Sequence, residues 1–93
     1  MYAIILHTVD DDRIKLKGVV TYRTDAYGQA IKILQDYIKD IKDFDFFSDL
    51  YFSTVYSLNG DTGEGISLMT RGKSTNEGEI AADRTLADVW ILG

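Results

Sequence analysis

Hydrophobic and polar residues form two neighbouring patterned blocks at the start of the chain. Residues 2–9 are nearly all apolar and rich in β-branched and aromatic side chains, which predicts a central strand buried on both faces. Residues 13–23 alternate with a period of two, placing Ile14, Leu16 and Val20 on one side and mostly basic residues on the other. Because a run of three aspartates separates the blocks, we expect a hairpin whose second strand is half-buried.

The spacing of apolar residues changes to three and four in residues 25–42. This periodicity predicts an amphipathic helix with one buried face, about 27 Å long. Thr24 and Asp25 stand at its start, where they supply N-cap chemistry and an acid for the first turn. Gly28 costs about 1 kcal/mol relative to alanine, and we expect it to allow close packing on the sheet.

Alternation returns in the second half of the chain. Residues 50–58 predict a strand, and residues 66–71 predict its returning partner. Residues 59–65 hold three of the eight glycines and predict the hairpin loop between them. A polar loop is expected at residues 72–78.

The C-terminal segment carries two conflicting signals. Thr85 and Asp88 stand three residues apart before an apolar run, which is the spacing of a capping box and favours a short helix. Residues 89–92, with the sequence VWIL, suit a closing strand equally well. We expect a strand preceded by a helical turn, with the short helix as the alternative.

The expected elements follow the order β-β-α-β-β, with a C-terminal strand or short helix. Hairpins joined through one long helix predict an antiparallel or mixed sheet of four or five strands with the helix on one face. The predicted fold class is therefore α+β, a two-layer sandwich. Residues 1–93 form a single domain, because 93 residues lie near the low end of domain size.

The composition favours a folded protein and excludes several classes. Hydrophobic residues make up 45% of the chain and charged residues 27%, as in globular domains. With no cysteine and one histidine, the chain has neither a disulfide framework nor a zinc cluster, and we expect no cofactor and no metal. No apolar run approaches the ~20 residues that span a bilayer, so we expect a cytoplasmic protein without a membrane partner.

Charge and aromatic residues point to a protein partner. The net charge of −5 disfavours direct binding to nucleic acid and suits a partner with a basic surface. Residues 43–52, DFDFFSDLYF, combine all four phenylalanines with three aspartates. The stretch either completes the core under the end of the helix or forms an apolar anchor ringed by charge, as protein-binding surfaces do.

Acidic residues extend from the helix into this stretch. Asp36, Asp40 and Asp43 line one side of the predicted helix and crowd its C-terminus, where the helix dipole disfavours negative charge. The pattern indicates either a solvated face or a surface kept for a partner. The predicted partner-binding residues are Asp36, Asp40, Asp43, Asp45, Asp49, Phe46, Phe47 and Tyr51.

A basic stripe on the second strand offers an alternative site. If the helix covers one face of the sheet, this stripe lies on the other face, and Tyr51 joins it. Basic and aromatic side chains on an open sheet can bind a nucleotide or single-stranded nucleic acid, although the ordinary wet face of a sheet has the same pattern. The residues of this alternative ligand site are Arg13, Lys15, Lys17 and Arg23.

No catalytic or metal motif is complete. The segment NGDTGEG lacks the spacing of a calcium loop and the lysine of a phosphate loop. His7 precedes the aspartate run, but nucleophilic catalysis would need a hydroxyl within its reach and a third group to orient it. We therefore expect a binding protein and not an enzyme.

Small size, acidic charge and the aromatic–acidic stretch together predict a protein-binding module. We expect an inhibitor of a basic nucleic-acid-handling enzyme that blocks the nucleic-acid groove, by analogy with the immunity, anti-restriction and anti-CRISPR (anti-defence) proteins of phages and other mobile elements. Nucleotide or single-stranded nucleic-acid binding at the basic stripe is the first alternative. A structural homo-oligomer, such as a homodimer through exposed aromatics, is the second.

Overall fold

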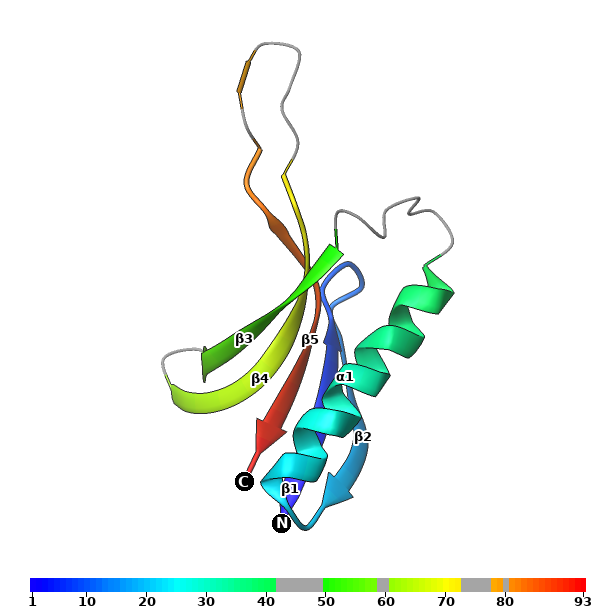
Figure 1. Cartoon of the computed structure of the whole chain (residues 1–93), viewed down its shortest axis with the longest axis vertical. Coiled ribbons are helices and arrows are strands. Elements are labelled where there is room, and N and C mark those ends of the chain that lie inside the picture. The colour runs from blue at the N-terminus through cyan, green and yellow to red at the C-terminus, as the bar shows by residue number, and fades with distance from the viewer. Residues whose placement is uncertain (42–49, 59–60, 73–77, 80) are drawn as a thin grey trace.

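A computed structural model describes residues 1–41, 50–58, 61–72, 78–79 and 81–93 of the chain. Within these ranges the protein consists of one α-helix and one five-stranded sheet (Figure 1). The elements in chain order are β1 (Tyr2–Thr8), β2 (Arg13–Val20), α1 (Arg23–Asp40), β3 (Leu50–Leu58), β4 (Asp61–Thr70) and β5 (Arg84–Leu92). The helix packs on one face of the sheet, so the predicted α+β fold is confirmed.

The strands run in the order β2-β1-β5-β4-β3, and every neighbouring pair is antiparallel. The C-terminal strand therefore lies at the centre of the sheet, and β2 and β3 form its edges. The expected closing strand is confirmed, whereas the helical turn before it and the alternative of a short helix with a capping box at Thr85 and Asp88 are wrong, because both residues belong to β5. Ala87, Val89 and Ile91 of this strand are buried, and pairing on both sides outweighs the local helix signal.

The β3–β4 hairpin is longer than the sequence pattern indicates. β3 has the predicted bounds, but β4 begins at Asp61, inside the segment predicted as a loop. Glu64 and Gly65 pair with Ile91 and Trp90 of β5, so the strand continues through the glycine-rich segment. Residues 59–60 and most of the predicted polar loop, residues 73–77, lie outside the described residues.

The core lies between α1 and the central strands. Ala26, Ala30 and Leu34 recur at intervals of four residues and are fully buried. They pack with Ile4 and Val89 of the sheet, and the two alanines allow the helix to lie close to it. The predicted amphipathic helix is confirmed, although it begins and ends two residues earlier than expected.

Side chains, and not an N-cap, hold the start of α1. Tyr22 occupies the N-cap position without a side-chain capping hydrogen bond, so the cap predicted at Thr24 is wrong. Arg23 Nε donates to Glu64 Oε1 at 2.6 Å, and the Tyr27 hydroxyl donates to Glu64 Oε2 at 2.8 Å. These contacts tie the first turn of α1 to β4.

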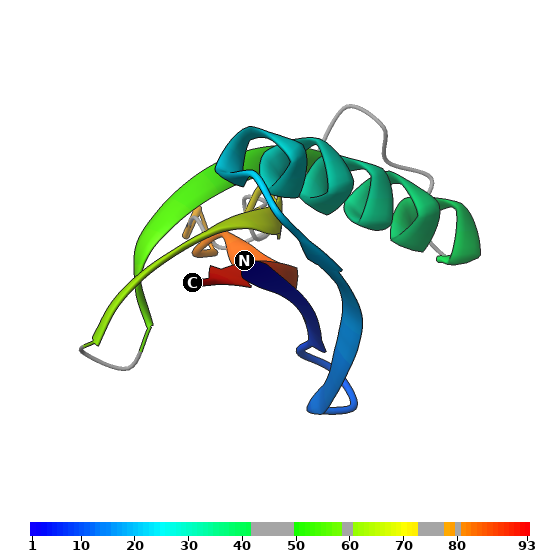
Figure 2. The ribbon, with the colours of Figure 1, turned by 90° about the horizontal axis from the view of Figure 1, so that it is seen from below.

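The sheet is twisted and arched, with α1 on its outer side. Figure 2 shows that the β1–β2 and β3–β4 hairpins bend away from the helix on either side of the two chain ends. We call the sheet face opposite α1 the open face, because no described element covers it. The prediction that β1 is buried on both faces is therefore wrong: Ile4 is buried on the helix side, whereas Ile5 and His7 on the open face are partly exposed.

A β-bulge in the β1–β2 hairpin decides which side chains of β2 face the helix. The register shifts after Ile4, so Ile5 pairs with Leu16 and Lys17 is left without a partner on β1. Because side chains alternate along a strand, a shift of one residue turns the side chains of residues 13–16 to the opposite face from the one predicted. Ile14 and Leu16 therefore lie on the open face, 72% and 61% exposed, and their predicted position on the buried side is wrong.

Candidate functional site

An apolar row crosses the open face. Leu16 of β2, Ile5 of β1 and Trp90 of β5 stand opposite one another in the pairing register and share this face. Ile14 and Val19 flank Leu16 along β2, and Val19 is 52% exposed. Single exposed apolar residues are ordinary, but neighbouring ones are less so, and Ile14, Leu16 and Val19 make this face a candidate interaction surface.

Trp90, the only tryptophan of the chain, lies at the centre of the open face. The residue is only 7% exposed. A Cβ on the opposing Gly65 would lie 2.3 Å from the Val89 carbonyl oxygen and 3.3 Å from Trp90 Cε3. Glycine at this position therefore lets β4 and the indole approach each other, and Val55 of β3 continues the apolar row beyond it.

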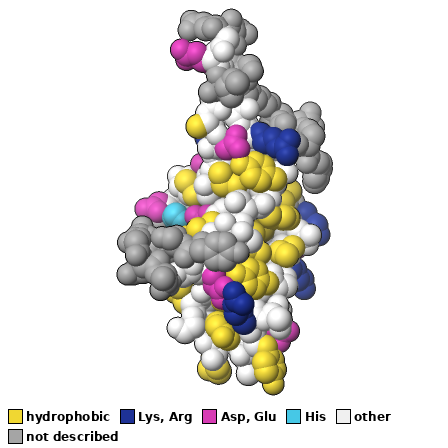
Figure 3. Space-filling view, turned by 60° about the vertical axis from the view of Figure 1, so that its left-hand side comes forward, with side chains coloured by type: hydrophobic (Ala, Val, Ile, Leu, Met, Phe, Trp, Pro, Cys, Tyr) yellow, Lys and Arg dark blue, Asp and Glu magenta, His cyan; other side chains and the backbone are white. Residues whose placement is uncertain are grey.

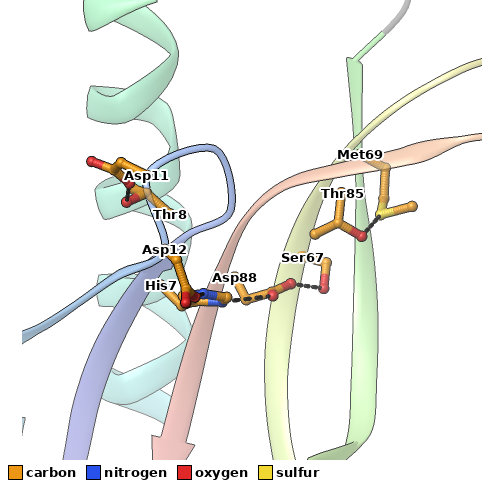
Figure 4. A network of polar contacts seen from close by, with 8 residues as sticks. All are labelled: His7, Thr8, Asp11, Asp12, Ser67, Met69, Thr85 and Asp88. Atoms are coloured by element: carbon orange, nitrogen blue, oxygen red, sulfur yellow. Dashed lines mark hydrogen bonds and ion pairs between the residues drawn. The ribbon is translucent and has the colours of Figure 1, made fainter.

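A polar row runs beside the apolar one. Ser67 Oγ donates a hydrogen bond to Asp88 Oδ1 at 2.5 Å, and Asp88 Oδ2 lies 3.6 Å from His7 Nδ1. His7 Nε2 donates to Asp12 Oδ1 at 2.8 Å. Figure 4 shows these four side chains in a line that runs from the β1–β2 turn across β5 to β4.

The β1–β2 turn directs Asp12 towards His7. Asp12 has a φ of 51°, a left-handed conformation that aspartate tolerates better than most residues do. Its N–H donates to the Val9 carbonyl at 3.3 Å, and the Val9 N–H donates to the Leu86 carbonyl at 3.1 Å, which fixes the turn to β5. The run of three aspartates thus forms the predicted turn and also supplies a partner for His7.

Two carboxylates control the charge of His7. The hydrogen bond to Asp12 raises the pKa of His7, Asp88 adds to this effect, and partial burial opposes it. His7 therefore stays protonated to a higher pH than a free imidazole. The Ser67 hydroxyl bonds to Asp88 and not to the imidazole, so the row does not position His7 to activate Ser67 as a nucleophile.

Tyr51 lies at the far end of the open face, on the edge strand β3. Its hydroxyl donates to Asp83, which also accepts the N–H of Gly72 at 2.8 Å. The Arg71 guanidinium lies 5.6 Å from the centroid of the Tyr51 ring, within cation–π distance. These contacts hold a partly exposed aromatic ring in place, while its role as a partner anchor stays a prediction.

The predicted acidic surface lies only partly within the described residues. Asp36 and Asp40 are exposed on the side of α1 that faces β2, where they line a shallow pocket of about 110 Å³ with Lys17. Tyr51 belongs to the opposite edge of the sheet, so the structure does not bring it together with these two acids. The other predicted partner-binding residues lie outside the described part of the chain: Asp43, Asp45, Asp49, Phe46 and Phe47.

The basic stripe does not lie on the open face. Arg13 and Lys15 pair with β1 residues that face the helix side, and together with Lys17 they line a groove of about 610 Å³ beside the end of α1. Arg23 is not part of the strand, because it begins α1 and bonds to Glu64. The predicted placement of the stripe is therefore wrong, and the physical reason is the bulge at Lys17.

An apolar cavity of about 460 Å³ lies between the second half of α1 and β3. Its lining includes Ile38, Leu50, Leu68 and Phe52, and Phe52 is 42% exposed. Figure 3 views the molecule from the side of the β3–β4 hairpin and shows hydrophobic side chains spread down this side between scattered charges. The cavity lies on the helix side of β3, and Tyr51 at the edge of the sheet also lines it.

Other kinds of site find no support in the described residues. Within them, no group of three or more histidine, cysteine or acidic side chains is arranged to hold a metal ion. No helix in the same part of the chain is long and apolar enough to cross a membrane. In comparisons with known proteins, no protein-family model, no curated protein and no solved structure matches the chain.

The sequence pattern did not predict the apolar residues of the open face, but one feature of it indicated the β-bulge. Val19 is the apolar residue that falls out of phase with the alternation of residues 13–23. A phase break next to Gly18 is typical of a β-bulge, which would have moved Ile14 and Leu16 to the other face. Asp88 and Ser67 carried no comparable signal, because only the pairing of β4 with β5 brings them together.

Proposed function

We propose that this protein is a small protein-binding module and that its open face receives a partner protein. The observation that supports this proposal best is the exposure of three neighbouring apolar side chains of β2, Ile14, Leu16 and Val19, on a face that no described element covers. Burying apolar surface contributes about 25 cal/mol per Å², so covering this row would stabilise a complex more than an exposed ion pair would.

The charge around the open face favours a partner with a basic surface. Asp12 and Asp88 flank His7 at one end, and Asp83 lies beside Tyr51 and Arg71 at the other, so these three acids outnumber the two cationic groups. The whole chain carries a net charge of −5. Complementary charge speeds the encounter with a basic partner and excludes acidic competitors.

We further propose that the partner is a basic nucleic-acid-handling enzyme and that this protein inhibits it by occupying the nucleic-acid groove. An enzyme of this class presents the positive surface that an acidic ligand needs. Asp36 and Asp40 on α1 lie away from the open face and add to the net negative charge that attracts such an enzyme at long range. The protein would then act in the manner of immunity and anti-defence proteins of mobile elements.

An affinity capture from host lysate with matched variants tests this function. The open-face variant combines Ile14→Gln with Leu16→Gln, which removes apolar surface without adding charge. Ile31→Gln is the control, because Ile31 is an exposed apolar residue on α1. We expect the wild type and the control to capture the same basic protein and the open-face variant to lose it. The captured enzyme should lose activity on nucleic acid when the wild type is added.

Three outcomes would overturn parts of this proposal. Equal capture by both variants would exclude the open face as the binding surface. Capture of a partner whose activity on nucleic acid is unaffected would exclude the inhibitor function. Sedimentation of the wild type as a dimer that the open-face variant abolishes would show that a second copy of the chain, and not another protein, covers the face.

A further inference from the structure

β2 is an edge strand with an unoccupied outer side. Its inner side pairs with β1 on both sides of the bulge at Lys17, and no other strand in the described part of the chain pairs with it. An edge strand presents unpaired N–H and C=O groups, which can accept an extended segment of another protein as an added strand.

The two faces of β2 differ in chemistry. Ile14, Leu16 and Val19 lie on the open face, and Arg13 and Lys15 lie on the helix side. The bulge at Lys17 adds a third cation to the helix side, where Lys17 shares a groove with the other two. An added strand would therefore meet apolar neighbours on one face and cations on the other.

The cations disfavour pairing of β2 with a second copy of itself. Two β2 strands side by side would place Arg13, Lys15 and Lys17 of both chains on one face, and like charges on neighbouring strands destabilise pairing. Lysines on an edge strand protect a sheet from edge-to-edge pairing with another copy in this way. The occupant of this edge is therefore a strand of opposite charge.

Two of the three cations are available to such a strand. Arg13 lies 3.5 Å from Asp11, whereas Lys15 and Lys17 form no ion pair within the described residues. The acids nearest to Lys17 belong to α1, which packs mainly over β1, β4 and β5. Asp11 and Asp40 also line the groove of the three cations, but within the described residues only Arg13 is paired with one of them, so Lys15 and Lys17 can pair with an added strand.

We propose that β2 binds an extended segment of the partner protein as a sixth strand, and that this segment alternates apolar and acidic residues. Its apolar side chains extend the row of Leu16, Ile5 and Trp90, and its acidic side chains face Arg13, Lys15 and Lys17. This inference rests on the proposed function and names the element of the partner that engages β2. The basic surface of the partner faces Asp12 and Asp88 instead.

Two synthetic peptides test the proposal with the intact protein. One alternates valine and glutamate, and the other alternates valine and lysine. We expect the glutamate peptide to bind about tenfold more tightly than the lysine peptide, because several favourable cross-strand charge pairs together give a difference of this size. Amide exchange in Arg13–Val20 should slow in its presence. Lys15→Glu combined with Lys17→Glu should reverse the preference, whereas Lys32→Glu combined with Lys39→Glu on α1 should leave it unchanged.

Equal binding of the two peptides, no binding of either, or protection of β3 instead of β2 would overturn the proposal. Because the substituted lysines are exposed, unfolding curves of the variants should match that of the wild type. The captured partner distinguishes this proposal from the proposed function. If it still binds the Lys15 and Lys17 variant but not the Ile14 and Leu16 variant, charge-directed strand addition is refuted and the proposed function is left intact.

Discussion

Gly28 lies in α1 with open space around it, because a Cβ at this position meets no atom within 4 Å. The expectation that it packs closely on the sheet is wrong, since the residue is exposed. We predict that Gly28→Ala raises the free energy of unfolding by about 0.5–1 kcal/mol, because alanine loses less backbone freedom on folding. Urea denaturation of the two proteins measures the difference.

Gly65→Ala is the matched control and should have the opposite effect. The new Cβ would meet the Val89 carbonyl oxygen at 2.3 Å and Trp90 Cα at 3.2 Å, and backbone atoms cannot move aside easily. We expect a lower free energy of unfolding and a changed environment of Trp90, which its fluorescence reports. A stabilising effect of both substitutions would contradict the packing of Trp90 against β4.

His7 should make folding stability depend on pH near neutrality. Its pKa is raised in the folded protein, so its contribution is fully present below its ordinary value of 6.5 and is lost as the pH rises through the higher folded value. We predict that the wild type loses free energy of unfolding between pH 6 and pH 8 relative to His7→Gln. Parallel pH profiles of the two proteins would show that Asp12 does not stabilise the imidazolium.

For single residues, the sequence predicts which side chains belong together better than it predicts the face of the sheet on which they lie. Ile14 and Leu16 were correctly separated from Arg13 and Lys15, but the bulge at Lys17 exchanged the faces of these two pairs, whereas Val20 lies on the predicted helix side. Contacts such as that between Ser67 and Asp88 depend on strand register, which a single residue of slippage reverses. Such contacts were therefore beyond the reach of local pattern.

Among the contacts between secondary-structure elements, Glu64 of β4 connects that strand to the start of α1. The Arg23 guanidinium lowers the pKa of Glu64, so its stabilising contribution is present above the ordinary value of 4.5 and disappears as the pH falls through the lower folded value. We predict that Glu64→Gln is less stable than the wild type at pH 7 and that the two converge in acid. A difference that persists below pH 3 would indicate packing and not charge.

The buried stripe of α1 should dominate the stability of the fold. Leu34 is fully buried against the sheet, and Leu34→Ala should lower the free energy of unfolding by about 2–5 kcal/mol. Ile31 is exposed on the same helix, and Ile31→Ala should change it by no more than about 0.5 kcal/mol. Thermal unfolding followed by circular dichroism distinguishes the two; similar losses would contradict the orientation of the helix.

Elements with a long, regular period were predictable from sequence. α1 and β3 have bounds within two residues of those expected, because helical spacing and strand alternation persist along each of them. β5 was ambiguous, since residues 84–92 carry both a local helix signal and an apolar run. Its position between β1 and β4 settles the conflict in favour of a strand, and such long-range pairing is invisible to a local pattern.

In the described part of the molecule, one helix covers one face of a five-stranded sheet and no element covers the other face. A chain of 93 residues has little apolar surface to spare, because small domains bury a smaller fraction of their surface than large ones do. Placing Ile14, Leu16 and Val19 on the outside therefore weakens the isolated fold. The proposed partner recovers this apolar surface by covering the open face.

The sequence led to the proposal of a protein-binding module, but it did not indicate the open face. Acidic charge and small size led to a protein-binding module, and these properties belong to the whole chain. The predicted binding surface followed α1 and residues 43–52, because charge and aromatic residues concentrate there. The open face depends on the strand order and the bulge, so it could be recognised only in the folded molecule.

Amide hydrogen exchange of this protein, free and bound to its captured partner, tests the central claim most directly. If the partner covers the open face, binding should slow exchange in β2, over Arg13–Val20, and in the neighbouring residues of β1, and should leave Gln29–Lys39 of α1 unchanged. Protection confined to α1, with exchange in β2 as fast as in the free protein, would contradict the account and return the binding surface to the acidic side of the helix.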